Sequence, residues 1–145
     1  MPTARNFFTP QEQELIVQAI AKAEQQTSGE IRLHMENICF GSELSRAEKV
    51  FHQLKMHETQ ERNGILIYLA VLSRKVAVIG DKGIHEQLGQ TFWQEIVNGL
   101  IEKFRSDRRA EALCDSIIKC GEQLGKFFPR SENDQNELPN TISYK

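Results

Sequence analysis

The sequence predicts a small three-layer α/β sandwich, in which helices cover both faces of one mixed sheet. Three observations support this fold class. Residues 30–36 alternate between polar and apolar side chains, which is typical of a strand with one buried face. Residues 65–72 and 76–79 are apolar runs with little alternation, which indicates strands covered on both faces. Amphipathic helical patterns precede, separate and follow these strands.

The first helix is predicted to begin after Thr9 and to end near Gln26. Thr9 can cap the helix, Pro10 suits its first turn, and Glu12 stands three residues after the cap, as in a capping box. Residues 1–8 are expected to form a lead-in to the domain. The predicted apolar stripe of this helix consists of Leu15, Ile16, Ala19, Ile20 and Ala23.

Three further helical segments are expected. A second capping box at residues 45–48 predicts a helix that connects the first strand to the second. After the third strand, residues 84–89 predict a short helical turn, and residues 92–104 a strongly amphipathic helix. A last helix is expected to end at Pro129. Residues 129–145 are polar and without periodicity, which predicts a flexible C-terminal tail after a domain at 9–128.

The order of elements predicts how the strands pair. Residues 30–36 and 65–72 are joined through a helix, so they should lie parallel, with a right-handed crossover of the Rossmann type. Residues 65–72 and 76–79 are joined at Ser73 and Arg74, so they should form an antiparallel hairpin. No glycine lies in that turn, which leaves its type open.

Composition narrows the class of protein. The chain has 145 residues, 39% hydrophobic and 26% charged, with a net charge of −2, as in an ordinary single-domain globular protein. The chain has no excess of basic residues that would favour binding to nucleic acid. It also has no apolar run that approaches the ~20 residues of a membrane-spanning helix. No leader pattern is seen, so a cytoplasmic monomer without a membrane partner is expected. Cys39, Cys114 and Cys120 lack metal-type spacing, which fits a reducing compartment.

Polar side chains gather where the predicted strands begin or end. Glu30 and Asn63 stand at the starts of two parallel strands, and Asp81 at the end of the antiparallel third strand. These ends should meet at one edge of the sheet, with Glu61 close by. Oxygen ligands of this kind suit Ca²⁺ or Mg²⁺. The alternative is that Asp81 caps the following helix and Glu30 is a solvated strand residue.

Asp107 is a further candidate, because it lies in the loop between the last two helices. It either faces the same metal site or caps the last helix, and its residue type favours the cap. The four histidines, at positions 34, 52, 57 and 85, show no tight ligand spacing, so no zinc site is expected.

Four segments together resemble the TPM domain family. They are Thr27-Ser28-Gly29-Glu30-Ile31-Arg32, Glu61-Arg62-Asn63-Gly64-Ile65-Leu66-Ile67, residues 74–84, and the 104–113 segment with its acidic turn. The similarity covers residues 9–128. It implies an αβα fold, the binding of divalent cations, and the acid phosphatase activity that is proposed for plant members of the family.

Three functions remain open. The first is a stand-alone binding or regulatory module that holds Ca²⁺ or Mg²⁺ through Glu30, Glu61, Asn63, Asp81 and Asp107, with an unidentified protein partner. The second is a metal-assisted phosphatase on phosphomonoesters, in which a bound cation polarises a phosphoryl oxygen and Asp81 acts as ligand, base or nucleophile. No nucleophile motif supports this second function. The third is an interaction domain without metal.

Overall fold

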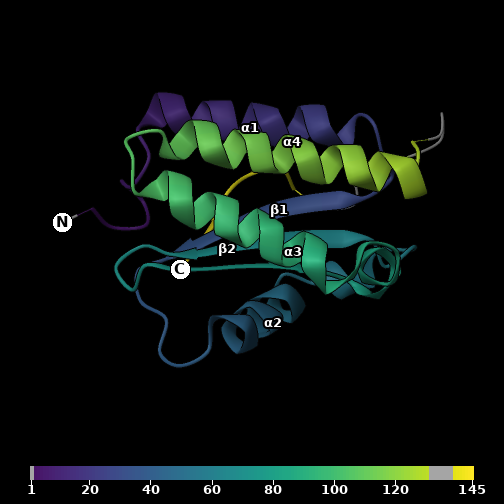
Figure 1. Ribbon diagram of the computed structural model, residues 1–145, viewed down its shortest axis with the longest axis horizontal. Coiled ribbons are helices and arrows are strands. Elements are labelled where there is room, and N and C mark those ends of the chain that lie inside the picture. Colours follow the sequence, from purple (N-terminus) through teal and green to yellow (C-terminus); the bar gives the residue numbers. More distant parts are fainter. Residues whose placement is uncertain (1, 131–138) are drawn as a thin grey trace.

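The computed structural model describes residues 2–130 and 139–145. It confirms the predicted small α/β sandwich: helices pack on both faces of a four-stranded sheet (Figure 1). In chain order the elements are α1 (Pro10–Glu24), β1 (Glu30–Glu36), α2 (Glu43–Gln53), the short 3-10 helix η1 (Met56–Glu58), β2 (Gly64–Ala70), β3 (Lys75–Gly80), α3 (Lys82–Phe104), α4 (Arg109–Phe127) and β4 (Ser143–Tyr144).

The strand order of the sheet is β3-β2-β1-β4. β1 and β2 are parallel, with Glu30 opposite Gly64, and β2 and β3 are antiparallel, with Ile65 opposite Gly80. The predicted crossover and hairpin are therefore both confirmed. In the hairpin turn, Arg74 adopts a φ of 54°, so this arginine takes the left-handed position that glycine commonly fills.

Two hydrophobic cores lie on opposite faces of the sheet. α1, α3 and α4 cover one face and α2 covers the other (Figure 1). Successive residues of a strand point to opposite faces, so Ile65 and Ile67 enter the first core while Leu66 and Tyr68 enter the second. This double coverage explains why β2 is apolar without alternation. None of the helices in the described part of the chain has the length and apolar character needed to cross a bilayer.

The start of α1 is as predicted, because Thr9 and Glu12 form the complete capping box. One residue of its predicted stripe does not belong there: Leu15 is 56% exposed. α2 begins earlier than predicted, since Ser42 and not Ser45 is its cap, and the Ser42 hydroxyl accepts a hydrogen bond from the Ser45 backbone N–H. Gly41, with a φ of 81°, turns the chain into this helix.

The helix after β3 is longer than predicted. α3 runs from Lys82 to Phe104 as 23 residues, and it joins the expected turn at 84–89 to the expected helix at 92–104. Gly89 interrupts its helical geometry with a φ of 76°, which explains why the pattern in the sequence divides there. Asp107 does not cap α4. The cap position is Arg108, which makes no capping side-chain hydrogen bond.

The end of the chain corrects the prediction of a structureless tail after Phe128. Ser143 and Tyr144 form β4, which pairs in parallel with His34 and Met35 of β1. Two residues are too few to show a strand pattern in the sequence, and the edge of β1 supplies their pairing partner. Residues 131–138 of the predicted tail lie outside the described residues.

Candidate functional sites at the two ends of the sheet

The sheet brings four of the five predicted metal ligands to one edge. The Glu30 N–H donates to the Asn63 carbonyl over 3.4 Å, and the Asp81 N–H donates to the Gly64 carbonyl over 2.8 Å. Glu61 precedes Asn63 in the same loop. The topological argument for this edge, at the amino ends of β1 and β2, is therefore confirmed, and the metal itself stays a prediction.

Asp107 lies elsewhere. Together with Glu12 and Leu15 it lines a groove between α1 and α4, near the beginning of α1. Glu30 follows the end of α1. Because α1 has 15 residues and a helix rises 1.5 Å per residue, about 22 Å separates the two places. The long α3 carries the chain from Asp81 to the far end of the molecule, so Asp107 cannot join the other four.

Asp81 acts as a helix cap and as an ion-pair partner. Its carboxylate accepts the Lys82 backbone N–H over 2.8 Å, which confirms the capping alternative. Arg62 donates two hydrogen bonds to the same carboxylate, over 2.7 and 3.0 Å. Asp81 is buried, whereas the Arg62 side chain is 48% exposed. The pair thus closes one side of this edge.

Beside the ion pair lies a smaller cluster of oxygen-bearing side chains. The Ser28 hydroxyl donates to the Glu61 carboxylate over 2.9 Å, and the Asn63 amide N–H group donates to both residues over 3.3 Å. Asn63 is 1% exposed. Its Oδ1 accepts no hydrogen bond from the residues that the structure describes. A buried amide oxygen in this state favours a partner that it can bind, such as a water molecule or a cation.

The same part of the chain lacks a dense set of classical metal ligands. Within residues 2–130 and 139–145, no three His, Cys, Asp or Glu side chains are grouped so that they could hold a metal ion. A cation at this edge would therefore have few carboxylate ligands and would also rely on amide, hydroxyl or backbone oxygens and on water, which Ca²⁺ and Mg²⁺ both accept.

A buried carboxyl pair lies directly behind this edge. Glu24, at the end of α1, and Glu30 are 5% and 1% exposed. Glu24 accepts the Ile31 N–H over 2.7 Å. Burial raises the pKa of Glu24 to about 8, and the neighbouring Glu30 carboxyl acts in the same direction, against the Ile31 hydrogen bond. Glu24 carried no sequence signal, and Glu30 is not the solvated residue of the alternative interpretation.

We expect the Glu24→Gln variant to change how stability depends on pH. A raised pKa in the folded protein means that the stabilisation is complete below the ordinary pKa of 4.5 and is lost as pH rises through about 8. The free energy of unfolding in urea should therefore be measured for both proteins. The value for the wild type minus the value for the variant should fall between pH 5 and 8.5. Glu14→Gln, at an exposed position of the same helix, is the control and should leave the pH profile unchanged. Parallel profiles for wild type and Glu24→Gln would contradict the assignment.

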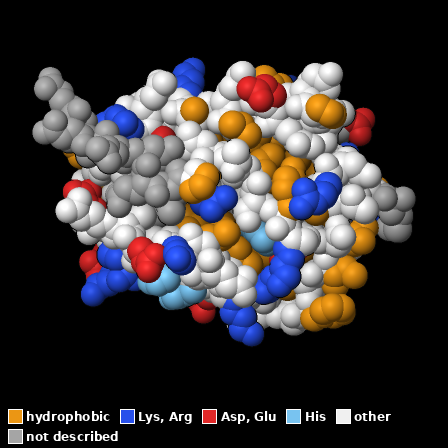
Figure 2. Space-filling view, turned by 180° about the vertical axis from the view of Figure 1, so that it is seen from behind, with side chains coloured by type: hydrophobic (Ala, Val, Ile, Leu, Met, Phe, Trp, Pro, Cys, Tyr) orange, Lys and Arg blue, Asp and Glu red, His pale blue; other side chains and the backbone are white. Residues whose placement is uncertain are grey.

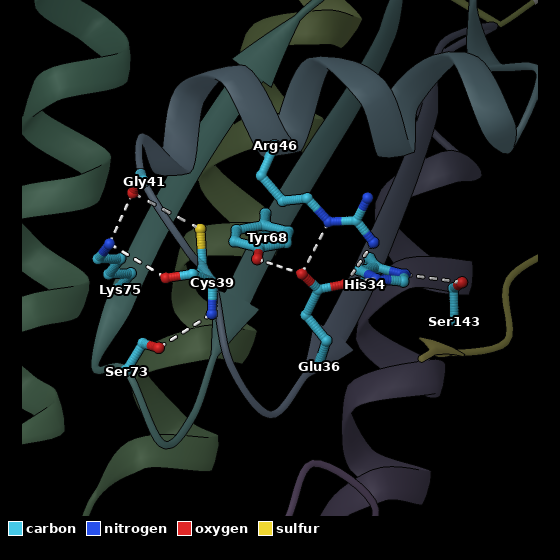
Figure 3. A network of polar contacts seen from close by, with 9 residues as sticks. All are labelled: His34, Glu36, Cys39, Gly41, Arg46, Tyr68, Ser73, Lys75 and Ser143. Carbon is cyan, nitrogen blue, oxygen red and sulfur yellow. Dashed lines mark hydrogen bonds and ion pairs between the residues drawn. The ribbon is translucent and has the colours of Figure 1, made fainter.

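The other end of β1 holds a second polar network (Figure 3). The Glu36 carboxylate accepts two hydrogen bonds from Arg46 of α2, each over 2.9 Å, and one from the Tyr68 hydroxyl. His34 lies 3.0 Å from Glu36 through Nε2 and 3.0 Å from the Ser143 hydroxyl through Nδ1. The network therefore ties β1, α2, β2 and β4 together.

The network fixes the charge of its members. Burial alone would raise the pKa of Glu36, but hydrogen bonds from Arg46, Tyr68 and His34 outweigh it and lower this pKa to about 2. Burial lowers the pKa of His34, against its hydrogen bond with Glu36. Glu36 is thus an anion and Arg46 its cation at neutral pH.

The sequence did not indicate this network. The alternation in β1 predicted that His34 and Glu36 face solvent, yet all seven residues of the strand are buried. Arg46 of the following helix α2 bonds to Glu36, and β4, from the far end of the sequence, pairs with the edge of β1 and bonds to His34.

Known proteins share the sequence pattern and the fold of this chain. The family model of the TPM domain matches residues 3–123. The BA42 protein of the psychrophilic bacterium Bizionia argentinensis, solved by NMR, is 42% identical, with 96% of each chain covered and a TM-score of 0.88. The N-terminal domain of a P. gingivalis protein is 18% identical, with 87% of this chain and 83% of that chain covered and a TM-score of 0.67, a likeness of fold alone. No curated protein matches.

Proposed function

This chain belongs to the TPM domain family, and we propose that it is a binding module for a divalent cation of the Ca²⁺ or Mg²⁺ type. The proposed site is the cluster of Ser28, Glu61 and Asn63 at the amino ends of β1 and β2. The observation that carries the proposal is the buried Oδ1 of Asn63, which accepts no hydrogen bond within the described residues and lies on a side chain bonded to a carboxylate.

The chemistry of the cluster suits a hard cation. Glu61 supplies a carboxylate on the exposed side, and the Ser28 hydroxyl is bonded to it. The Asn63 amide turns its N–H group to both, so rotation of this amide would bring its oxygen to the same ion. Hard cations bind carboxylate, amide and water oxygens together, and Mg²⁺ in particular keeps several waters. The residues therefore fit a weakly held, partly hydrated ion.

Asp81 is a further candidate ligand beside this cluster. Its carboxylate is engaged by Arg62, so direct ligation by Asp81 requires the guanidinium to move away. The Arg62 side chain is 48% exposed, which leaves room for that movement. Binding is consequently expected to compete with the Arg62–Asp81 ion pair, and Arg62→Gln should strengthen cation binding by removing the competing positive charge.

Titration of Ca²⁺ or Mg²⁺ followed by amide chemical shifts tests the site. We expect the largest shifts at Ser28, Glu61 and Asn63, and Glu61→Gln should weaken binding by about tenfold through loss of the carboxylate charge. Asp107→Asn is the matched control, because it removes one carboxylate about 22 Å away from the region of Glu30 and should leave binding unchanged.

Two results would overturn the proposal. One is the absence of any shift in the 28–30, 61–63 and 81–83 loops at millimolar metal. The other is an equal response of wild type and Glu61→Gln. Phosphomonoester hydrolysis with Asp81 in a catalytic role stays a prediction, and turnover of an aryl phosphate that is lost in Asp81→Asn is its test.

A further inference from the structure

The carboxyl end of β1 lies at a place where α/β sheets commonly bind ligands. β1 has β2 on one side and β4 on the other. The chain reaches β2 over the face covered by α2, and reaches β4 after α3 and α4 on the opposite face (Figure 1). In open α/β sheets, ligands bind in the crevice beyond the carboxyl ends of the strands. This crevice forms where the connections from neighbouring strands run over opposite faces of the sheet.

A pocket occupies this crevice. Its volume is about 400 Å³, within the range of small-molecule sites. Its lining consists of Glu36, Asn37, Ile38, Cys39, Phe40, Arg46 and Lys145. The loop after β1 is held in place by Lys75, whose ammonium donates to the carbonyls of Cys39 and Gly41 over 3.2 and 2.6 Å. The pocket is therefore built on a braced loop.

The hydrogen bonding of the pocket favours an anion over a cation. Both oxygens of Glu36 are already engaged, one by Arg46 and His34 and the other by Arg46 and Tyr68. A cationic ligand would have to break those bonds. Arg46 has five N–H donors and its side chain is 21% exposed, so its outer edge can meet a ligand while the inner edge stays on Glu36. Lys145 adds a second positive side chain to the lining.

The mouth of the pocket is apolar. Phe40 is 89% exposed and Ile38 is 48% exposed, although both lie on a loop whose backbone is fixed. Leu44 and Leu72, on the adjoining α2 and hairpin turn, are 48% and 37% exposed. Seen from behind, hydrophobic side chains gather with Lys and Arg side chains beside them, at the lower right where this loop lies (Figure 2).

We propose that this pocket binds a small organic anion, whose carboxylate or phosphate group is taken by Arg46 and Lys145 and whose apolar part lies against Ile38 and Phe40. Glu36 is the positioning residue, since it holds the Arg46 guanidinium at one orientation. The site is separate from the proposed cation site, which lies at the opposite end of β1.

Two matched aromatic probes, benzoate and phenyl phosphate, test the proposal and separate the two acidic groups. Amide shifts should appear at residues 37–40 and at Lys145 with at least one probe. Benzylamine, which has the same ring and the opposite charge, should give none at equal concentration. Inorganic phosphate and acetate, which lack the ring, should bind about tenfold more weakly than their aromatic counterparts.

Variants that leave the buried network intact complete the test. Phe40→Ser and Lys145→Gln change exposed side chains, so the fold is expected to survive both. Each substitution should lower the affinity for the tighter-binding aromatic anion by about tenfold. Leu15→Ser removes an exposed apolar side chain elsewhere and should leave binding unchanged. Shifts that are equal for benzylamine, or that persist in both variants, would overturn the proposal, as would no response to either aromatic anion.

Discussion

Replacing Glu36 with alanine is expected to lower the free energy of unfolding by about 3 to 5 kcal/mol, the usual cost of removing one partner from a buried ion pair. The substitution leaves Arg46, Tyr68 and His34 without the carboxylate that accepts from them. Tyr68 is 0% exposed in the intact protein, so its hydroxyl depends on Glu36 for a hydrogen-bond partner. The loss of stability comes chiefly from these donors, which are left without an acceptor, and less from the lost attraction between the charges of Glu36 and Arg46.

Urea unfolding at neutral pH measures the effect of Glu36→Ala. Asp115→Ala is the control, because it also removes the carboxylate of an ion pair. In that pair the Lys103 ammonium and the Asp115 carboxylate are 3.8 Å apart, and both side chains are more than half exposed. Exposed pairs contribute at most about 1 kcal/mol. Similar losses in the two variants would show that the Glu36 network is not a unit of the core.

The same network makes the protein sensitive to acid. Because the folded pKa of Glu36 is lowered to about 2, its stabilisation is complete above the ordinary pKa of 4.5 and is lost as pH falls through about 2. Glu24, with its raised pKa, acts in the opposite sense at higher pH. The two ends of β1 therefore titrate in different pH ranges, and the variants can be distinguished by this behaviour.

Local patterns were sufficient to predict the order of the main elements. The capping box of Thr9 and Glu12, the alternation in β1 and the apolar run in β2 each depend on residues close in sequence. The parallel crossover then placed Glu30, Asn63 and Asp81 at one edge, since topology fixes which strand ends meet. That part of the candidate site followed from the sequence.

The remaining features depend on contacts between distant segments. Glu36 and Tyr68 are 32 positions apart, and His34 and Ser143 are 109 apart, so no local period encodes either contact. Asp107 was misplaced because Gly89 divides the pattern of α3, which hides the full 23-residue length that carries the chain away. Polar residues on a strand cannot reveal from sequence alone whether water or another element covers them.

Gly83→Ala is expected to destabilise the protein by about 1 to 3 kcal/mol and to disturb the proposed cation cluster. A Cβ at this position would lie 2.4 Å from the Glu61 carbonyl oxygen and 2.6 Å from that of Arg62, and both are backbone atoms. The Gly83 N–H also donates to the Arg62 carbonyl over 2.8 Å, so the loop at 61–62 must move or lose this bond.

Whether Gly83→Ala lowers or raises the free energy of unfolding is the informative result, because helix propensity alone predicts that it raises it. Alanine is favoured over glycine inside a helix by up to about 1 kcal/mol. Gly99 lies in the same helix with nothing within 4 Å of an added Cβ, so Gly99→Ala should stabilise the protein by roughly that amount. Urea unfolding of both variants, with amide shifts at Glu61 and Asn63, measures the contrast. Stabilisation by both substitutions would mean that the loop at 61–62 yields freely and does not hold the cluster in one geometry.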